Sequence, residues 1–366
     1  MGLSDPVEIL KICHQPRKFD PLVNWIPCST FIEELYLCVT PRQADSLVTY
    51  AAESIGEGDK EKLGEMLICI AAFTGASLDK VGRALISKKI FYPGIVFCRC
   101  SEIVRDELIL LVESDNENRN LLLLALAWIG DEKVIRLFAE WRNESPSWGD
   151  LLFIAPEEYA KQAGWELASD STRRDLFLHK ALGLEASASE ETERFAAIRN
   201  RSGICSWCSG ALINLFEFDP ILLEIGKDDG SQKTLTIPTC QVCTAFGQYS
   251  GVYSKDGEWS LCSEKPEYLP DDSDSWDRLP ENPLKLGASR TLMHSAGSCL
   301  PTTLSQIGGL PAWEQDAEYP DCPKCQKTMK FVGQISDTDI EEYSEGIFYG
   351  FICRPCRATS TSYQQT

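Results

Sequence analysis

Residues 205–208 of the sequence read CSWC, and three further Cys-x-x-Cys pairs follow: CQVC at 240–243, CPKC at 322–325 and CRPC at 353–356. A Cys-x-x-Cys turn points two sulfurs at one metal ion, and a second such turn completes the tetrahedron of ligands that zinc prefers. Grouped two by two, the pairs predict two structural zinc ions. The predicted ligands are the thiolates of Cys205, Cys208, Cys240, Cys243, Cys322, Cys325, Cys353 and Cys356.

The two sets of cysteines also resemble each other in their surroundings. The run CSWCSGALINLFEFD begins at Cys205 and CPKCQKTMKFVGQIS begins at Cys322, with Leu212 and Met329 at the same offset. The second pair of each set, in PTCQVC and FICRPC, follows an apolar run that is typical of a strand. The spacers within each set are longer than in a standard zinc ribbon and have room for a hairpin plus a loop. We therefore expect a duplicated ribbon.

Other uses of these thiols remain open. A redox Cys-x-x-Cys motif usually stands once, at the start of a helix after a strand, whereas four pairs in two sets fit metal better. Disulfides need an oxidising compartment, and the N-terminal MGLSDPVEIL has neither the basic nor the apolar region of a secretory signal. Unpaired core thiols, and iron in place of zinc, are the remaining alternatives.

The length and composition indicate a globular protein. The chain has 366 residues, which is enough for two or three domains, and 43% of them are hydrophobic. Its most apolar run, residues 121–129, is too short to cross a bilayer. We expect a cytoplasmic protein with no membrane partner.

The chain is strongly acidic. It contains 55 acidic and 35 basic residues, for a formal net charge of -20. Such a field repels a nucleic-acid backbone, so we expect no nucleic-acid partner, although zinc ribbons often bind one. The same field attracts basic proteins and speeds their encounter. Solubility alone is the alternative explanation of the acidic composition.

Residues 1–184 are predicted to form a helical domain. Thr40 and Pro41 make an N-cap and first-turn pair, and the apolar residues from Ala44 to Ile55 then share one face. Caps, breakers and apolar periodicity predict further helices over 59–73, from Ser77, over 101–114, from Asn118, after Asp131, from Pro156 and over 173–182.

One stretch of this domain, ALAWIGDEKVIRLFAEW at 125–141, is similar to a HEAT-type helical repeat. One helix ends at Ile-Gly-Asp and the next begins directly after it. The similarity covers about one repeat, and it implies a short irregular solenoid, an architecture that usually holds another protein. An ordinary helical domain without a binding groove is the alternative.

The residue pattern of the sequence changes after residue 184. Residues 185–194 are small and acidic and are predicted to be a linker, and residues 195–366 are predicted to be a zinc-binding β module. Turns at GKDDGSQ, between 221–225 and 234–237, and at Lys255-Asp256-Gly257 predict hairpins. The expected fold class is therefore α+β: an irregular, HEAT-like helical domain followed by a mainly β module with two zinc-ribbon-like sites.

Three phrases in the last third form a combined pattern: Gly-Gly-x-Pro-x-Trp, then the pair CPKC, then Phe-x-x-Gln. Their residues outside the cysteines are Gly308, Gly309, Pro311, Trp313, Phe331 and Gln334. This pattern resembles the YwqG-like family and the C-terminal part of the programmed cell death protein 2 family. The first pair of cysteines and the N-terminal half lie outside the match.

The resemblance implies a zinc-supported β module that binds protein. Relatives of programmed cell death protein 2 look after a newly made ribosomal protein, and YwqG-like modules occur among immunity proteins encoded beside polymorphic toxins of bacteria. Helical repeats followed by such a module resemble the immunity type more closely.

The sequence offers little for catalysis. It contains no His-Glu-x-x-His, no Gly-x-Ser-x-Gly, no phosphate loop and no dinucleotide fingerprint. Four thiolates also close the coordination shell of zinc and leave no position for a reacting water. His14, His179 and His294 have no partner in sequence, so we expect structural or surface roles for them. We expect no enzyme, and no catalytic or cofactor-binding residues.

The predicted function is protein binding. In the first version, an immunity protein neutralises a bacterial polymorphic (Rhs-type) toxin by occluding its basic domain. In the second, a chaperone or adaptor holds an endogenous basic protein of the ribosomal type. Candidate contact residues, which would otherwise be solvated surface, are Trp276 with its Pro- and Asp-rich surroundings, Asp337, Asp339, Glu341, Glu342 and Glu345.

Overall fold

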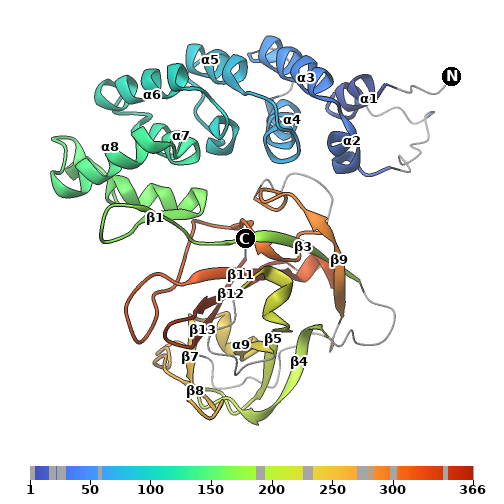
Figure 1. The fold of residues 1–366 in the computed structure, drawn as a ribbon, viewed down its shortest axis with the longest axis vertical. Helices are drawn as coiled ribbons and strands as arrows, with labels where there is room; N and C mark the ends of the chain where they lie inside the picture. The colour runs from blue at the N-terminus through green and yellow to red at the C-terminus, as the bar shows by residue number, and fades with distance from the viewer. Residues whose placement is uncertain are drawn as a thin grey trace. The chain divides into compact units, whose positions relative to one another are not determined.

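The structure is a computed structural model that describes most of the chain. The described residues are 5–15, 22, 30–56, 60–186, 194–225, 234–269, 280, 283–296, 303–340 and 345–365. They divide into a helical unit, whose described part ends at Arg174, and a β unit, which begins at Asp175. Figure 1 shows helices in the first unit and mainly strands in the second. The predicted α+β fold class is therefore confirmed.

The helical unit consists of short helices that follow one another in a row along the chain (Figure 1). Their bounds are α1 Pro6–Cys13, α2 Ile32–Cys38, α3 Pro41–Ser54, α4 Lys60–Phe73, α5 Asp79–Ser87, α6 Glu102–Ser114, α7 Arg119–Ile129 and α8 Glu132–Asn143. The 3₁₀ helices η1 Gly94–Phe97, η2 Gly149–Leu151 and η3 Pro156–Ala163 and the strands β1 Trp165–Leu167 and β2 Arg173–Asp175 complete it.

The caps that the sequence predicted set the ends of these helices. Thr40 and Gln43 form a capping box at the start of α3. Gly130 adopts a left-handed conformation (φ 52°) and ends α7. The carboxylate of Asp131 then accepts hydrogen bonds from the N–H groups of Lys133 (3.1 Å) and Val134 (3.0 Å) and begins α8.

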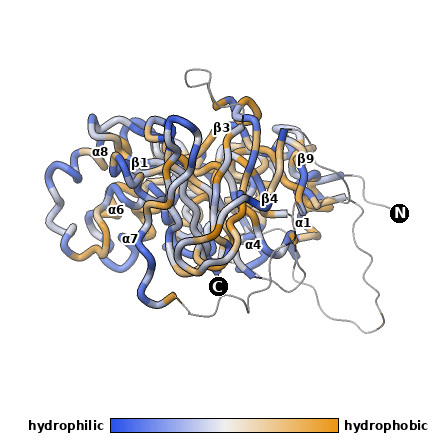
Figure 2. The backbone as a smooth tube through the Cα atoms, turned by 90° about the horizontal axis from the view of Figure 1, so that it is seen from below, coloured by the Kyte–Doolittle hydropathy of each residue, from blue (hydrophilic) through white to orange (hydrophobic). Residues whose placement is uncertain are grey.

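Polar and apolar residues are mixed along helices such as α6 and α8, whereas α7 is mostly apolar; Figure 2 colours the chain by hydropathy. Leu122, Leu126, Val134 and Phe138 are fully buried. In α8, charged residues alternate with the buried Val134 and Phe138, which is the pattern of an amphipathic helix at the edge of a core. No helix among the described residues combines the length and the apolar character needed to cross a membrane.

The helix predicted over 173–182 is wrong. Residues 173–175 belong to β2, and Leu178–Ala186 is strand β3. The leucines of this stretch also fit a helical face, but β3 pairs with strands far away in sequence, and that pairing overrides the local pattern. The domain boundary predicted at residue 184 therefore falls inside β3. Of the predicted linker 185–194, the first two residues end β3, and 187–193 lie outside the described residues.

The β unit contains two antiparallel sheets. The described strands pair in the order β8-β7-β13-β12-β11-β10-β3-β9 in the larger sheet and β4-β5-β6 in the smaller one. The remaining elements are β4 Phe195–Ile204, β5 Ala211–Phe218, η4 Pro220–Leu223, β6 Leu235–Thr239, α9 Gln241–Thr244, β7 Tyr249–Tyr253, β8 Trp259–Leu261, β9 Leu284–Arg290, β10 Gln306–Gly309, β11 Lys330–Ser336, η5 Asp337–Asp339, β12 Ile347–Cys353 and β13 Ala358–Gln364.

Of the two hairpins predicted from turns, one is present. β7 and β8 pair across the Lys255-Asp256-Gly257 turn, where Gly257 has φ 87°. The strand predicted over 221–225 is wrong, because Asp219 caps the 3₁₀ helix η4 by accepting a hydrogen bond from the N–H of Ile221 (2.9 Å). β6 pairs with β5 instead. Residues 226–233 of that turn lie outside the described residues.

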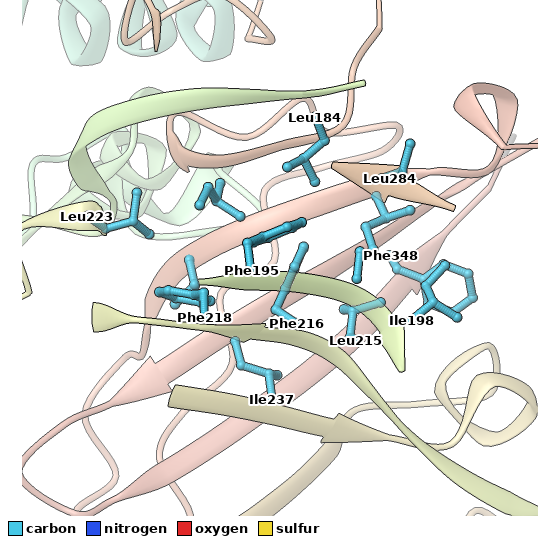
Figure 3. Packing of buried hydrophobic residues seen from close by; sticks show 14 of the residues in the cluster. Leu184, Phe195, Ile198, Leu215, Phe216, Phe218, Leu223, Ile237, Leu284 and Phe348 are labelled. Carbon is cyan, nitrogen blue, oxygen red and sulfur yellow. The ribbon is translucent and has the colours of Figure 1, made fainter. Parts of the chain in front are cut away.

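The core of the β unit lies between its two sheets. Phe195, Phe216 and Ile237 point from the smaller sheet into this core, as Figure 3 shows. Leu184 and Phe348 enter it from the larger sheet. Face-to-face packing of this kind buries one side of each sheet and fixes the strands that carry the cysteines.

Candidate metal centres

The structure brings the eight predicted cysteines together in two groups of four, in the combinations that the spacing predicted. Within each group the sulfur atoms lie within 4.8 Å of one another. The Sγ–Sγ distances are 3.6 Å between Cys205 and Cys243 and 3.7 Å between Cys325 and Cys353. Four sulfurs around zinc at about 2.3 Å are separated by about 3.8 Å, so both groups have the size of a tetrahedral zinc site. We call them the first and the second ribbon, with the first containing Cys205 and the second Cys322.

The first Cys-x-x-Cys turn has the same backbone in both ribbons. In the first ribbon the N–H of Cys205 donates to the carbonyl of Gly210, and the N–H of Ser209 donates to the carbonyl of Cys205, both at 2.8 Å. In the second ribbon Cys322 and Gln326 make the same two bonds at the same offsets, both at 2.9 Å. Ser209 and Gln326 both adopt the left-handed conformation, with φ 63° and 57°. Such turns aim two sulfurs at one point.

The strands that follow these turns pair in the same register. Ile213 pairs with Thr239 in the first ribbon, and Lys330 pairs with Ile352 in the second. Both pairs join the residue eight places after the first cysteine to the residue just before the third. Hairpin register is sensitive to a slip of one residue, so the agreement is specific.

Both ribbons also contain an irregularity at the same place. The register shifts between Asn214 and Phe216 in the first ribbon and between Phe331 and Gly333 in the second. A shift of this kind places an extra residue on one strand and bends it. The two ribbons are therefore two copies of one backbone geometry, as the duplicated sequence pattern predicted.

The copies pack against each other at equivalent positions. Beyond the bulge, Phe216 pairs with Ile237 in the first ribbon, and Gly333 pairs with Gly350 in the second. A Cβ atom on Gly350 would lie 3.1 Å from the ring of Phe216 and 3.2 Å from the side chain of Ile237. The large residues of one copy thus occupy the space left by the glycines of the other. Figure 3 shows the side chains of Phe216 and Ile237.

The sulfurs of the first ribbon lie in an apolar and aromatic cluster. Cys205, Cys240 and Cys243 are at most 2% exposed, and Trp207 and Tyr249 pack against them. The hydroxyl of Tyr249 donates to the Sγ of Cys205 (3.3 Å). Burial raises the pKa of Tyr249, so this hydroxyl stays protonated and continues to donate this hydrogen bond.

The sulfurs of the second ribbon are more accessible. Cys322 is buried, Cys353 and Cys356 are half-buried and Cys325 is exposed. A hydrogen bond from the backbone N–H of Lys327 is the main reason that the pKa of Cys325 falls to about 7. Its thiolate is the form that binds metal.

Each group resists full ionisation by itself. In the first ribbon, hydrogen bonding with Cys240 lowers the pKa of Cys205, and the bond with Cys205 raises the pKa of Cys240 to about 12. In the second, burial raises the pKa of Cys353, and its neighbouring thiols raise it further. Only a cation in the centre lets all four thiols of a group lose their protons, so the donor set fits a divalent metal ion.

The histidines take no part in these centres. His14 contacts the Tyr36 hydroxyl (3.0 Å) and the Glu65 carboxylate (3.6 Å) inside the helical unit. His179 is 66% exposed and lies 3.1 Å from Asp175. His294 is half-buried, and this partial burial lowers its pKa to about 3. These surroundings agree with the structural and surface roles that we expected.

Part of the predicted acidic contact surface is wrong. Asp337 is only 5% exposed and accepts a hydrogen bond from the hydroxyl of Tyr363 (2.9 Å). Asp339 accepts one from the N–H of Ser305 (2.7 Å), and burial raises its pKa. Both carboxylates hold the β unit together. Glu345 is exposed, whereas Glu341, Glu342 and Trp276 lie outside the described residues.

The phrases that carry the family resemblance meet on the second ribbon. The side-chain oxygen of Gln334 accepts from the N–H of Ala312 (2.8 Å), which joins the Phe-x-x-Gln phrase to the Gly-Gly-x-Pro-x-Trp phrase. Trp313 packs on Tyr349, with ring centres 4.8 Å apart. Gly308 has φ 69°, and a Cβ there would lie 1.8 Å from a backbone oxygen, so only glycine fits.

An exposed apolar run in the helical unit was not predicted from the sequence. Leu151, Phe153 and Ile154 are 70%, 97% and 48% exposed. Phe153 and Ile154 border a recess of about 460 Å³ that Trp141 also lines. The signal was present, since GDLLFIAP at 149–156 is apolar without helical or strand periodicity. Trp207 and Tyr249, the aromatic neighbours of the first ribbon, had no comparable signal in the sequence.

Comparison with known proteins gives one informative match. The chain is 42% identical over 372 aligned residues to the uncharacterized protein YpfL of Salmonella typhimurium (strain LT2), and the match covers 100% of this chain and 87% of that protein. No family model matches the sequence, and no solved structure matches it.

Proposed function

The chain belongs to the same family as YpfL of Salmonella typhimurium, and on that premise we propose that it binds another protein in the cytoplasm and holds two structural zinc ions. The ions would be held by the eight cysteines of the two ribbons. Zinc in a shell of four thiolates cross-links the chain and leaves no open position for a substrate. The activity is therefore binding, and the zinc centres keep the β unit rigid for it.

The observation that carries this proposal is the exposed apolar run of the helical unit. Phe153 is 97% exposed, and large apolar side chains in such positions are typical of protein interfaces. Asp150, directly before the run, is exposed and lines the same recess as Phe153. An aromatic anchor with a carboxylate rim complements an apolar pocket with a basic rim. Together with the net charge of -20, this favours a basic partner protein.

The role we propose for this binding is immunity. The partner would be the basic domain of a bacterial polymorphic (Rhs-type) toxin, and binding would occlude its active surface. Charge steering gives fast association, and a buried aromatic anchor gives slow dissociation. The resemblance to YwqG-like modules supports this role.

A second role is that of a chaperone or adaptor for an endogenous basic protein of the ribosomal type. The observation in its favour is the set of contacts among the phrases shared with the programmed cell death protein 2 family, centred on Gln334 and Trp313. These contacts lie on the second ribbon rather than on the helical unit.

Gene deletion separates the two roles. For immunity, we expect the deletion to be tolerated only when the adjacent toxin gene is deleted as well. A plasmid copy of the chain should restore growth, and a copy with Phe153→Asp should not. A copy with Leu110→Asp, which changes another exposed apolar residue (72% exposed, in α6), should restore growth. Normal growth of the single deletion while the neighbouring gene is expressed would reject immunity. A defect in ribosome assembly in that strain would support the second role.

A further inference from the structure

The two ribbons differ most in the charge of their Cys-x-x-Cys turns. The turns of the second ribbon, CPKCQK and CRPCR, contain Lys324, Lys327, Arg354 and Arg357, which we call the basic tip. The corresponding turns of the first ribbon, CSWCSG and CQVCT, contain no charged residue. Since the backbones of the two copies agree, geometry alone does not require these cations.

The cysteine sulfurs do not require these four cations either, as hydrogen-bond donors or as balancing charges. In the first ribbon the N–H of Gly210 donates to the Sγ of Cys208 (3.4 Å), two residues earlier. In the second ribbon the backbone N–H of Lys327 donates to the sulfur of Cys325, also two residues earlier. The backbone therefore supplies equivalent donors to both centres. The four cations also exceed the two negative charges that a divalent ion with four thiolates carries.

The lysines of the basic tip are available to a ligand. Lys324 and Lys327 are exposed, and no ion pair joins either of them to an acidic residue in the part of the chain that the structure describes. Arg354 and Arg357 are half-buried and belong to the second Cys-x-x-Cys turn, whose cysteines lie together with Cys322 and Cys325. A guanidinium at such a position offers paired donors that match a carboxylate.

The basic tip is also rigid. Each of its turns contains a proline, Pro323 and Pro355, whereas the turns of the first ribbon contain none. Proline fixes one backbone dihedral, and four bonds to a metal ion would fix the turns further. Charges held in place before binding lose little conformational entropy when a ligand docks.

The acidic residues that precede the first turn of the second ribbon limit the kind of anion that can bind to the basic tip. Asp316, Glu318 and Asp321 are exposed and precede the first turn of the second ribbon. A long polyanion such as RNA would run from the basic tip onto these carboxylates and onto a chain of net charge -20. A short acidic segment has a footprint small enough to avoid them.

We infer that the basic tip of the second ribbon is a docking surface for a short acidic segment of a partner protein. This site is separate from the apolar run that we propose for a basic partner, and it would give the protein two binding surfaces of opposite charge. Recognition would consist of ion pairs from Lys324 and Lys327 and bidentate bonds from Arg354 and Arg357 to neighbouring carboxylates.

The test uses the full-length, zinc-loaded protein and a fluorescein-labelled polyglutamate peptide of about twelve residues, followed by fluorescence anisotropy. We expect the double variant K324Q/K327Q to bind at least about tenfold more weakly than the unmodified protein. The matched control K255Q/K265Q, which removes two exposed lysines elsewhere in the β unit, should stay within about twofold. Raising the salt concentration from roughly 0.05 to 0.3 M should weaken peptide binding to the unmodified protein. It should also reduce the difference in peptide affinity between the unmodified protein and K324Q/K327Q.

A second measurement needs no substitution. Acetylation of lysines in the unmodified protein, read by mass spectrometry, should be slowed by bound peptide at Lys324 and Lys327 at least about threefold, and not at Lys255 or Lys265. Because this acetylation measurement uses the unmodified protein, it remains valid if a lysine variant fails to bind zinc. Equal effects at both lysine pairs, or no peptide binding, would overturn it. Tighter binding of a single-stranded RNA of about twelve nucleotides through the same lysines would replace the acidic segment with nucleic acid.

Discussion

In the first ribbon three of the four cysteines are at most 2% exposed, whereas in the second Cys325 is exposed and Cys353 and Cys356 are half-buried. The backbones agree in hydrogen bonds, register and bulge, so this contrast comes from what packs around each copy. Trp207 and Tyr249 cover the first ribbon. One geometry therefore supports a buried structural centre in one copy and an accessible, charged one in the other.

Removing one ligand from each ribbon should show the largest difference between them. Cys243→Ser changes a fully buried cysteine of the first group. If that group holds zinc as we propose, we expect loss of this ion and unfolding of the β unit. A structural zinc contributes on the order of 10 kcal/mol of apparent folding free energy, which is comparable with the whole stability of a domain. Cys325→Ser, at the exposed position, should lose the second ion and leave the first ribbon folded.

Metal content, measured by mass spectrometry, and limited proteolysis report these outcomes. Cys262→Ser, which removes an exposed cysteine outside both groups, is the control and should match the unmodified protein. If Cys243→Ser kept two ions and resisted protease like the control, the first ribbon would not be a metal centre. The same metal analysis distinguishes zinc from iron.

The rate of metal loss should also separate the ribbons. A chelator reaches the second centre directly through Cys325, whereas the first must open locally. If that opening requires about 3 kcal/mol, the first ion leaves on the order of 100-fold more slowly. We expect two phases when a coloured chelator such as 4-(2-pyridylazo)resorcinol is added in excess, and Cys325→Ser should abolish the fast one. A single phase for both ions would show that burial does not control access.

The cysteine spacing was sufficient to predict which thiols meet, because a Cys-x-x-Cys turn is local and its partner is the next such turn along the chain. The caps at Thr40 and Asp131 were equally local and equally predictable. The duplication could be detected from Leu212 and Met329, since both copies place a buried residue at the same offset.

The remaining features depend on residues distant in sequence. β3 was predicted as a helix because its leucines fit a helical face, and its partners β9 and β10 lie about a hundred residues later. The burial of the first ribbon depends on Tyr249, which no pattern connects to Cys205. Asp337 and Asp339 looked like surface carboxylates because a sequence does not show that Tyr363 and Ser305 donate to them.

The packing between the two copies gives the smallest expected effect and tests why the copies are unequal. Gly350→Ala places a methyl group 3.1 Å from the ring of Phe216 and 3.2 Å from Ile237. Overpacking of a filled core costs about 1–3 kcal/mol, so the free energy of unfolding should fall by that amount in a denaturant titration. Gly64→Ala is the matched control, because nothing lies within 4 Å of a Cβ there and the residue is inside α4. Alanine at that position should stabilise the protein by about 0.5–1 kcal/mol.

The sign of the interaction energy between two substitutions then identifies the cause of this loss of stability. Phe216→Leu makes room at the contact, so it should reduce the loss caused by Gly350→Ala, with an interaction energy of about 0.5–3 kcal/mol between the two changes. Strictly additive effects would mean that Gly350 matters for its own strand rather than for the fit between copies. In the expected case, a glycine pair in the second ribbon accommodates the Phe216–Ile237 pair of the first. Two identical ribbons could not pack in this way, because both would then present large side chains, or both glycines, at the same contact.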